Sequence, residues 1–205
     1  GKNLVGSIYQ PKAVFIDQNL LKTLPKQEII AGMGEILKYG VIADRKFFDN
    51  VSDWLSDIEN FPIDKAIEVC CKIKASIVSK DEKENGIRTI LNFGHTVAHA
   101  LESNFGFQTI KHGEAVSFGM LCAGYISFRL EKLNEEQYLY LKKTIKKLPL
   151  PKLKKLNYSQ LLTYIKRDKK YENGILKFVI LNKIGNAEIT KKVGENLLLE
   201  SLSEL

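Results

Sequence analysis

All three histidines of the 205-residue chain, His95, His99 and His112, lie in one short stretch. Imidazole is a common zinc ligand and the usual general acid or base near neutral pH. His95 and His99 are four residues apart, so on a helix they would share one face and reach one site. The alternative is a set of core histidines whose nitrogens are satisfied by hydrogen bonds. Because the chain has no other histidine, we favour a role in metal binding or catalysis over a structural role, and we take His95 and His99 as a ligand pair.

A glutamate and a lysine interrupt the apolar run GMGEILKYG at residues 32–40. Glu35 is a natural third ligand for a two-histidine site, because catalytic zinc takes three protein ligands and keeps one position open. Lys38 follows three residues later and would lie on the same helical face. The alternative is a surface ion pair, which contributes little to stability.

A polar series leads into the histidines. Lys74 comes first, then the run DEKENGIR at 81–88, and Arg88, Asn92 and His95 follow at spacings of four and three. On one helix this spacing predicts a single face with a cation, an amide and an imidazole. A solvated stripe does not explain the alignment, because the neighbouring residues of the segment are apolar.

The elements that must position these groups are mainly helical. A short apolar run at 13–17 is typical of a β-strand, which needs strand neighbours that are hard to find in the rest of the chain. A hairpin is predicted from 176–181 and 187–190, joined by a turn at 182–186. Apolar periodicity predicts helices at 25–39, 44–57, 63–80, 90–103, 113–132, 134–147 and 158–166.

Composition limits the class of protein. The formal net charge is +7, but the lysines are spread along the chain and are not interleaved with aromatic residues, so we expect no nucleic-acid partner. No apolar run is long enough for a membrane helix, and no basic-then-apolar leader opens the chain, so we expect a soluble cytoplasmic protein without a membrane partner. The three cysteines are too few and too badly spaced for a disulfide framework.

Seven segments together resemble the 3-dehydroquinate synthase family, in the same order along nearly the whole chain. They are GKNLVGSIYQP at 1–11, GMGEILKYG at 32–40, KA at 74–75, DEKENGIR at 81–88, LNFGHTVAHA at 91–100, HGEAV at 112–116 and DKK at 168–170. One departure is Gly34, where the family often has alanine. By intrinsic propensity this glycine would cost the helix about 1 kcal/mol.

The resemblance implies an enzyme of the shikimate pathway, in aromatic amino acid biosynthesis, that converts the sugar-acid phosphate DAHP into 3-dehydroquinate and phosphate. The family uses a transient NAD+ and a divalent metal, Zn2+ or Co2+, and is expected to form a homodimer. Its N-terminal half is an α/β dinucleotide-binding domain, and its C-terminal half is helical and holds the metal. Residues 1–24 would be the tail of the first domain and 25–205 the second.

The resemblance changes the reading of the histidines. It implies that Glu35, His95 and His112 are the metal ligands, and it moves His99 from the ligand shell to proton transfer. A nearby imidazole that does not bind the metal can move the substrate's proton. Glu84 is implied to be a second acid or base.

The resemblance also implies a pocket for an anionic substrate that carries a carboxylate and a phosphate. Arginine and lysine suit both groups. The substrate residues would be Asn3, Lys38, Lys74, Arg88, Asn92 and Lys169, with Lys170 as the alternative to Lys169; Lys38, Arg88 and Asn92 would also belong to the catalytic set. Lys2, Thr23 and Leu24 would lie against NAD. The sequence holds no glycine-rich dinucleotide loop, so we expect the chain to be inactive alone and to need an upstream NAD domain.

Two alternatives remain beside a dehydroquinate synthase. One is a different sugar phosphate cyclase, which would keep the metal ligands and NAD but change the cations facing the carboxylate. The presence of Lys74, Arg88 and Asn92 argues against it. The other is a non-catalytic metal-binding or basic fragment. Such a fragment would tolerate loss of its active residues, and every residue that can be matched is intact.

Overall fold

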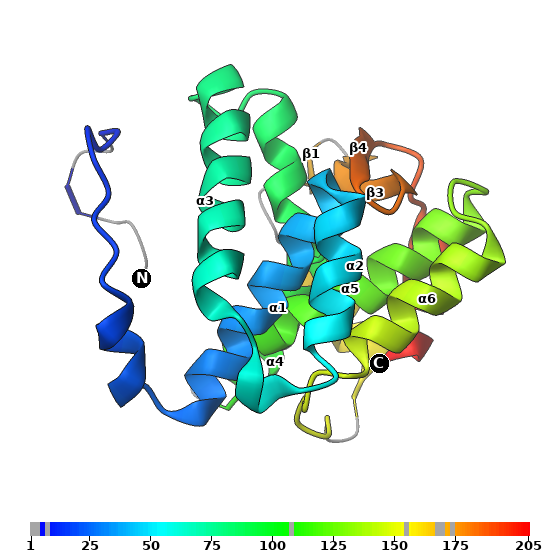
Figure 1. Cartoon of the computed structure of the whole chain (residues 1–205). Coiled ribbons are helices and arrows are strands. Elements are labelled where there is room, and N and C mark those ends of the chain that lie inside the picture. Colours follow the sequence, from blue (N-terminus) through cyan, green and yellow to red (C-terminus); the bar gives the residue numbers. More distant parts are fainter. Residues whose placement is uncertain (1–4, 7–8, 107–108, 154–155, 167–170, 173–174) are drawn as a thin grey trace.

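The computed structural model describes residues 5–6, 9–106, 109–153, 156–166, 171–172 and 175–205, and it is mainly helical (Figure 1). Its α-helices and short 3-10 helices (η) are η1 (Gln18–Thr23), α1 (Lys26–Ala43), α2 (Arg45–Trp54), η2 (Ile58–Asn60), α3 (Ile63–Lys80), η3 (Ile87–Asn92), α4 (His95–Phe105), α5 (His112–Arg129), α6 (Glu135–Ile145), α7 (Tyr158–Lys166), α8 (Glu195–Ser201) and η4 (Leu202–Glu204).

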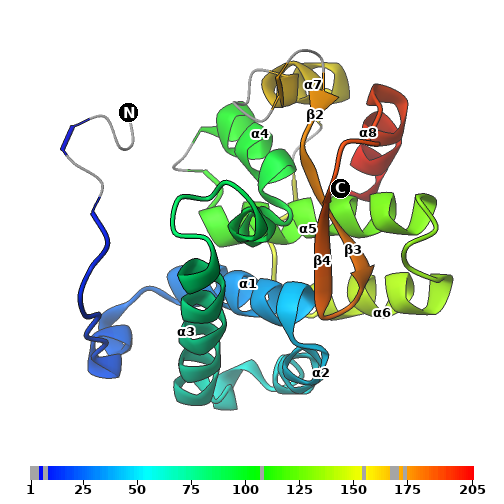
Figure 2. The ribbon, with the colours of Figure 1, turned by 90° about the horizontal axis from the view of Figure 1, so that it is seen from above.

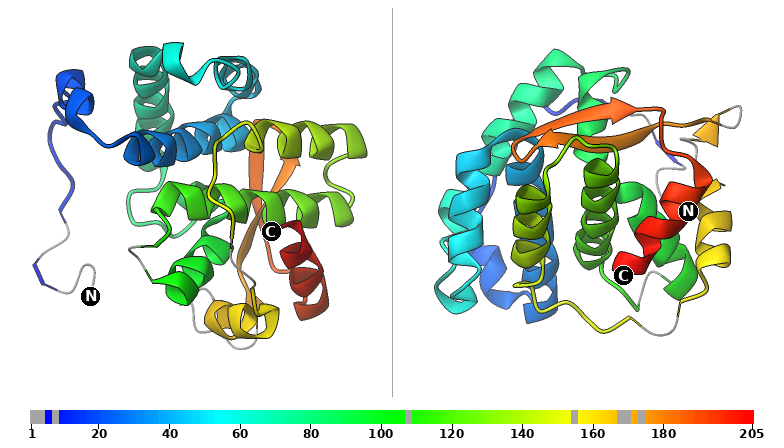
Figure 3. Two further views of the ribbon diagram at one scale, coloured as in Figure 1. Left: turned by 90° about the horizontal axis from the view of Figure 1, so that it is seen from below. Right: turned by 90° about the vertical axis from the view of Figure 1, so that its right-hand side faces the viewer.

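Helix α5 lies at the centre of the molecule, and α1, α4, α6 and α8 pack around it (Figures 2 and 3). Its sequence is apolar on nearly every face, and most of its side chains are buried. A helix without a polar face is stable only when other elements surround it. His112 is the first residue of α5, so the core helix of the fold carries one of the predicted ligands at its start.

Two small antiparallel hairpins complete the described structure. They are β1 (Tyr171–Glu172) with β2 (Ile175–Leu176), and β3 (Phe178–Lys183) with β4 (Asn186–Thr190). The larger hairpin is attached to the helical core by its backbone, because Leu181 N donates to Ser127 Oγ on α5 at 3.0 Å. Gly185 N, at the turn, donates to the carbonyl of Val41 on α1 at 2.7 Å.

The predicted mainly helical class and the larger hairpin are confirmed. The helices expected at 63–80 and 158–166 are found as α3 and α7, and most other boundaries shift by a few residues. The first hairpin and α8 were not predicted. Both are too short to produce a clear periodic pattern.

The helix expected at 90–103 is wrong in its first turn. Residues 87–92 form the 3-10 helix η3, the chain turns at Gly94 with φ +78°, and α4 begins only at His95. Arg88, Asn92 and His95 therefore do not share the face of one α-helix. The turn follows from packing: a Cβ on Gly94 would lie 2.9 Å from both Met120 N and Val116 O, so only glycine fits so close to α5.

The strand expected at 13–17 does not form either. This run pairs with no other segment of the described chain, and the segment before α1 stands apart from the helical body (Figure 1). Val14 and Phe15 are 72% and 95% exposed. The apolar residues predicted a strand, but a strand needs neighbours to satisfy its backbone. None of the described helices is both long and apolar enough to span a bilayer.

Candidate metal centre

Glu35 is brought to the site by a close crossing of α1 and α5. A Cβ added to Gly34 would lie 2.5 Å from the carbonyl oxygen of Gly113. A Cβ on Gly113 would lie 1.8 Å from the carbonyl of Ala31. The two helices thus touch backbone to backbone at the residues next to Glu35 and His112. The absence of side chains at the crossing sets how closely these two groups approach each other.

His95 is positioned by a second glycine contact with α5. Its preceding residue, Gly94, presses on α5 so closely that a Cβ on Gly119 would lie 1.9 Å from the Gly94 carbonyl. Each of Glu35, His95 and His112 is therefore a sequence neighbour of a glycine that lies against another helix. Close contacts between backbones therefore hold the three groups together.

These three residues converge on one point. His95 Nε2 lies 3.7 Å and His112 Nε2 lies 3.6 Å from Glu35 Oε1. Each residue offers one ligand atom, and the three atoms lie within 4.8 Å of one another. Glu35 Oε1 is buried and accepts no hydrogen bond from the described part of the chain. A buried carboxylate oxygen in this position is costly unless a cation compensates it.

The spacing fits a metal ion better than it fits hydrogen bonds. Both Glu35–histidine distances are too long for a hydrogen bond. Two ligands about 2.1 Å from a tetrahedral zinc lie about 3.4 Å apart, so small shifts would bring these atoms into coordination. One carboxylate and two imidazoles are also a donor set that catalytic zinc uses.

The other ring nitrogen of His95 and of His112 has a partner, and this arrangement turns Nε2 toward Glu35. His95 Nδ1 lies 3.1 Å from the carbonyl oxygen of Phe93. His112 Nδ1 lies 3.0 Å from Glu102 Oε1. Both acceptors favour the tautomer with hydrogen on Nδ1, which leaves the Nε2 lone pair for a metal. Glu102 was not predicted, because nothing in the sequence distinguishes it from the other carboxylates; its burial on α4 is seen only in the structure.

Lys38 occupies the second oxygen of the same glutamate. Its Nζ lies 2.5 Å from Glu35 Oε2, and the residue is 3% exposed. The predicted alternative of a surface ion pair is therefore wrong. Burial raises the pKa of the next residue, Tyr39, above its usual range, and the Glu35 carboxylate adds to this shift.

His99 lies beside the three groups but outside the set that converges. Its ring centroid is 5.8 Å from that of His95 and 6.4 Å from that of His112, and the residue is exposed. The geometry therefore favours Glu35, His95 and His112 over the pair that spacing alone suggested. His99 is close enough to reach a small molecule held at that site.

The loop after α3 is ordered around one carboxylate. Asp81 accepts hydrogen bonds from the backbone N–H groups of Asn85, Gly86 and Arg88 at 3.0, 2.8 and 2.9 Å. These bonds, the one from Arg88 first, lower the pKa of Asp81. Asp81 thus fixes the backbone between Glu84 and Arg88.

Glu84 and Asn92 meet across this loop. Asn92 Nδ2 donates to Glu84 Oε1 at 2.7 Å. Glu84 has φ +58°, a left-handed conformation that is uncommon for a residue with a side chain. Such strain is retained where the surroundings determine it and often accompanies function.

A hollow of about 780 Å³ lies beside the loop, within the usual range for a small-molecule site. Arg88 is one of its cations, and its guanidinium also donates to the Glu82 carbonyl. The segment before α1 forms the opposite wall with three residues that sequence reasoning missed. The lining residues are Tyr9, Gln10, Lys12, Glu82, Lys83, Glu84 and Arg88.

In the described part of the chain, Lys74, Thr23 and Leu24 make no hydrogen bond or ion pair with the metal centre. Lys74 is exposed on α3, which packs against η3. Thr23 and Leu24 are exposed at the end of η1, where Thr23 Oγ1 donates to the Leu20 carbonyl. Lys2, Asn3 and Lys169, with the alternative Lys170, lie outside the described residues.

Comparison with known proteins decides the family. The sequence model of the 3-dehydroquinate synthase C-terminal domain matches residues 32–171, and that of the N-terminal domain matches residues 1–31. This chain belongs to the 3-dehydroquinate synthase family. The boundary between the two matches falls inside α1, a few residues after the boundary predicted at 24/25, which stays a prediction.

Relatives in this family are similar along the whole chain. The 3-dehydroquinate synthase of Aliivibrio fischeri is 41% identical over 100% of this chain and 58% of its own length. That of Colwellia psychrerythraea is 42% identical over 98% of this chain, again 58% of its own length. The chain thus spans a little over half the length of these curated relatives.

Solved structures show the same fold. A 2-deoxy-scyllo-inosose synthase complexed with carbaglucose-6-phosphate, NAD+ and Co2+ aligns with a TM-score of 0.78 and 27% identity, over 100% of this chain and 59% of that chain. A 2-epi-5-epi-valiolone synthase from Streptomyces hygroscopicus with NAD+ and Zn2+ bound has a TM-score of 0.79 over 91% of this chain and 53% of its own; at 21% identity it shows the fold alone.

Proposed function

We propose that this chain is the metal- and substrate-binding part of a 3-dehydroquinate synthase, which converts DAHP into 3-dehydroquinate and phosphate in the shikimate pathway. The convergence of Glu35, His95 and His112 within 4.8 Å carries the proposal. Identity of about 41% with 3-dehydroquinate synthases along the whole chain supports it. The proposal includes NAD+, a native metal that is zinc or Co2+, a homodimer and a cytoplasmic location.

Glu35, His95 and His112 would hold the metal through Oε1 and the two Nε2 atoms. When bound, the divalent metal supplies Lewis acidity toward a substrate hydroxyl, and NAD+ supplies a transient hydride acceptor. Lys38 balances the charge on the other Glu35 oxygen. This pairing holds the carboxylate in place and leaves Oε1 directed at the histidines.

His99 is proposed to move the proton of the hydroxyl group that is oxidised. It is exposed beside His95 and His112, and imidazole is the usual general acid or base in enzymes. Glu84 is proposed as a second acid or base. Its support is the unusual backbone conformation and the hydrogen bond from Asn92, which fix the carboxylate at the edge of the hollow.

Arg88 and Lys12 make the hollow attractive to an anion, although Glu82 and Glu84 share its walls. Arg88 is proposed to bind the phosphate or carboxylate of the substrate in a bidentate manner. Lys74, Asn3 and Lys169 remain proposed substrate residues, and Lys2, Thr23 and Leu24 remain proposed NAD contacts.

The test is phosphate release from DAHP by the full-length protein with NAD+ and zinc, together with detection of 3-dehydroquinate. We expect turnover that a chelator abolishes and that added zinc restores. Arg88→Ala should raise KM and lower kcat/KM, because a charged contact to the substrate is lost. An Arg45→Ala variant is a matched control, since Arg45 pairs with Asp49 on the surface of α2.

Other cyclases of this fold offer the alternative outcome. The full-length protein could fail to convert DAHP but release phosphate from sedoheptulose phosphate, or close a ring from glucose phosphate. This result would assign the protein to a different cyclase reaction. Protein that binds no metal and turns over none of these substrates would contradict the proposal and favour a non-catalytic role.

A further inference from the structure

We propose that Glu102 is a positioning residue for the metal site, which holds His112 in the orientation and tautomer that binds the metal. This inference rests on the proposed function, because it concerns the same three ligands. The carboxylate lies on α4 and the histidine on α5, so the contact also joins two helices of the core.

His112 is the ligand that most needs support. Its side chain is 45% exposed, compared with 11% for His95 and 30% for Glu35. An exposed imidazole keeps several rotamers, and choosing one of them costs conformational entropy. Its place at the first turn of α5 fixes the backbone but leaves the ring to be held by other groups.

Glu102 is suited to hold that ring. The residue is 7% exposed, and its Oε1 lies 3.0 Å from His112 Nδ1. A buried carboxylate is stable only with a partner that offsets its desolvation. Burial therefore favours the conformation in which Glu102 contacts His112. A carboxylate that accepts a hydrogen bond from Nδ1–H makes Nε2 a stronger electron-pair donor.

The two ligand histidines are held differently, which makes the proposal testable. His95 Nδ1 faces the Phe93 backbone carbonyl, whereas His112 Nδ1 faces a side chain. Substitution of Glu102 therefore acts on one ligand and leaves the other in place. In Glu102→Gln, an amide oxygen can still accept a hydrogen bond from Nδ1–H but lacks the charge, whereas Glu102→Ala removes both the acceptor and the charge.

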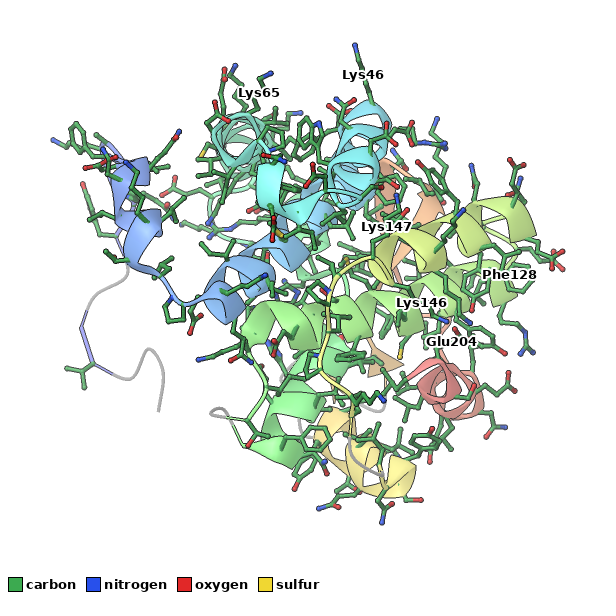
Figure 4. All side chains as sticks on the ribbon, turned by 60° about the horizontal axis from the view of Figure 1, so that its bottom comes forward. Lys46, Lys65, Phe128, Lys146, Lys147 and Glu204 are labelled. Carbon is green, nitrogen blue, oxygen red and sulfur yellow. The ribbon has the colours of Figure 1, made fainter. Side chains whose placement is uncertain are left out.

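The first measurement is the zinc affinity of the full-length protein, obtained by competition with a chromogenic chelator. We expect Glu102→Ala to weaken binding about 10- to 100-fold, the usual effect of losing such a partner, and Glu102→Gln to fall between Ala and the parent. Glu204→Gln is a matched control. This glutamate, labelled in Figure 4, is half-buried, with a side chain that is 12% exposed, and its carboxylate lies 2.6 Å from Lys142 Nζ.

The control lies far from the metal centre. Burial raises the pKa of the Cys122 thiol, and the nearby Glu204 carboxylate adds to this shift. At the helical rise, Cys122 lies about 15 Å along α5 from His112. Glu204→Gln should therefore lower the melting temperature without changing zinc affinity. If Glu102→Ala weakened zinc binding only by destabilising the protein, Glu204→Gln would weaken it too. A positioning role for Glu102 predicts that only Glu102→Ala lowers the zinc affinity.

The second measurement needs no metal. With histidines labelled with 15N in the metal-free full-length protein at alkaline pH, long-range proton–nitrogen correlations report the tautomer of each ring. We expect His112 to carry its hydrogen on Nδ1 in the parent and on Nε2, the usual form in water, in Glu102→Ala. His95 should keep its tautomer in both proteins.

The outcomes separate the two proposals. If His112→Ala binds zinc as tightly as the parent does, the metal site itself is wrong, and the role of Glu102 is wrong with it. If His112→Ala loses zinc but Glu102→Ala keeps both the parent affinity and the parent tautomer, only the role of Glu102 is overturned.

Discussion

At the scale of single residues, the clustering of histidines predicted a site, and the structure brings His95, His99 and His112 together in it. Helical spacing alone suggested His95 and His99, whereas the geometry favours His95 with His112. His95 and His99 share a helix, but Nε2 of His95 converges with His112, which lies on another helix. The family resemblance supplied this partner, because no local pattern relates α4 to α5.

Glu102 shows what the sequence could not reveal. Its carboxylate on α4 contacts His112 on α5. In the sequence it looks like any of the other carboxylates of the chain. Only the packing of α4 on α5 distinguishes this one. Residues that support ligands are chosen by tertiary contacts, so residue type and spacing do not identify them.

The separate roles proposed for His99 and His112 give a direct prediction. His99→Ala in the full-length protein should keep its metal and lose about 10²- to 10⁴-fold in kcat, the usual contribution of a proton-transfer group. His112→Ala should lose both the metal and turnover. The measurements are zinc content and phosphate release, and equal zinc loss in the two variants would restore His99 as a ligand.

At the scale of elements, most helices could be predicted from apolar periodicity, whereas the break before α4 could not. The break depends on how closely Gly94 approaches α5, which is a property of the packed structure. The same holds for Gly34. Intrinsic propensity describes it as a cost to α1, but the structure shows that it permits the crossing next to Glu35.

The glycine crossing predicts opposite effects of one substitution at two sites of α1. Gly34→Ala should lower the free energy of unfolding by about 1–3 kcal/mol and weaken zinc binding, because its Cβ would lie 2.5 Å from the Gly113 carbonyl. Gly32→Ala, with nothing within 4 Å, should raise stability by up to about 1 kcal/mol. Denaturant unfolding compares them, and a stabilised Gly34→Ala would contradict the crossing as described.

The loop around Asp81 predicts a dependence on pH. Backbone hydrogen bonds, led by that from Arg88, lower the pKa of Asp81 in the folded protein. Its stabilisation is therefore present above the unfolded pKa of about 4 and is lost as the pH falls through the lower folded value. Hydrogen exchange should show faster opening of Gly86 and Arg88 in acid, and Asp81→Asn should open them at neutral pH. Equal protection in the variant would contradict this role.

At the scale of the whole molecule, the chain is a helical unit that matches a little over half of its relatives. The sequence predicted a mainly helical chain, and most of its motifs fall within residues 32–171, which match the C-terminal domain of the family. It also suggested a strand at 13–17, and the structure shows why that inference fails within this chain. Apolar residues specify a strand only when a sheet is present to receive them, and the described chain offers none there.

The most direct test of the metal centre is a crystal structure of the full-length protein loaded with zinc, with anomalous data collected at the zinc edge. We predict one strong peak about 2.0–2.2 Å from Glu35 Oε1, His95 Nε2 and His112 Nε2, with His99 outside the coordination sphere. A peak bound to His99 in place of His112, or no peak among these residues, would contradict the account.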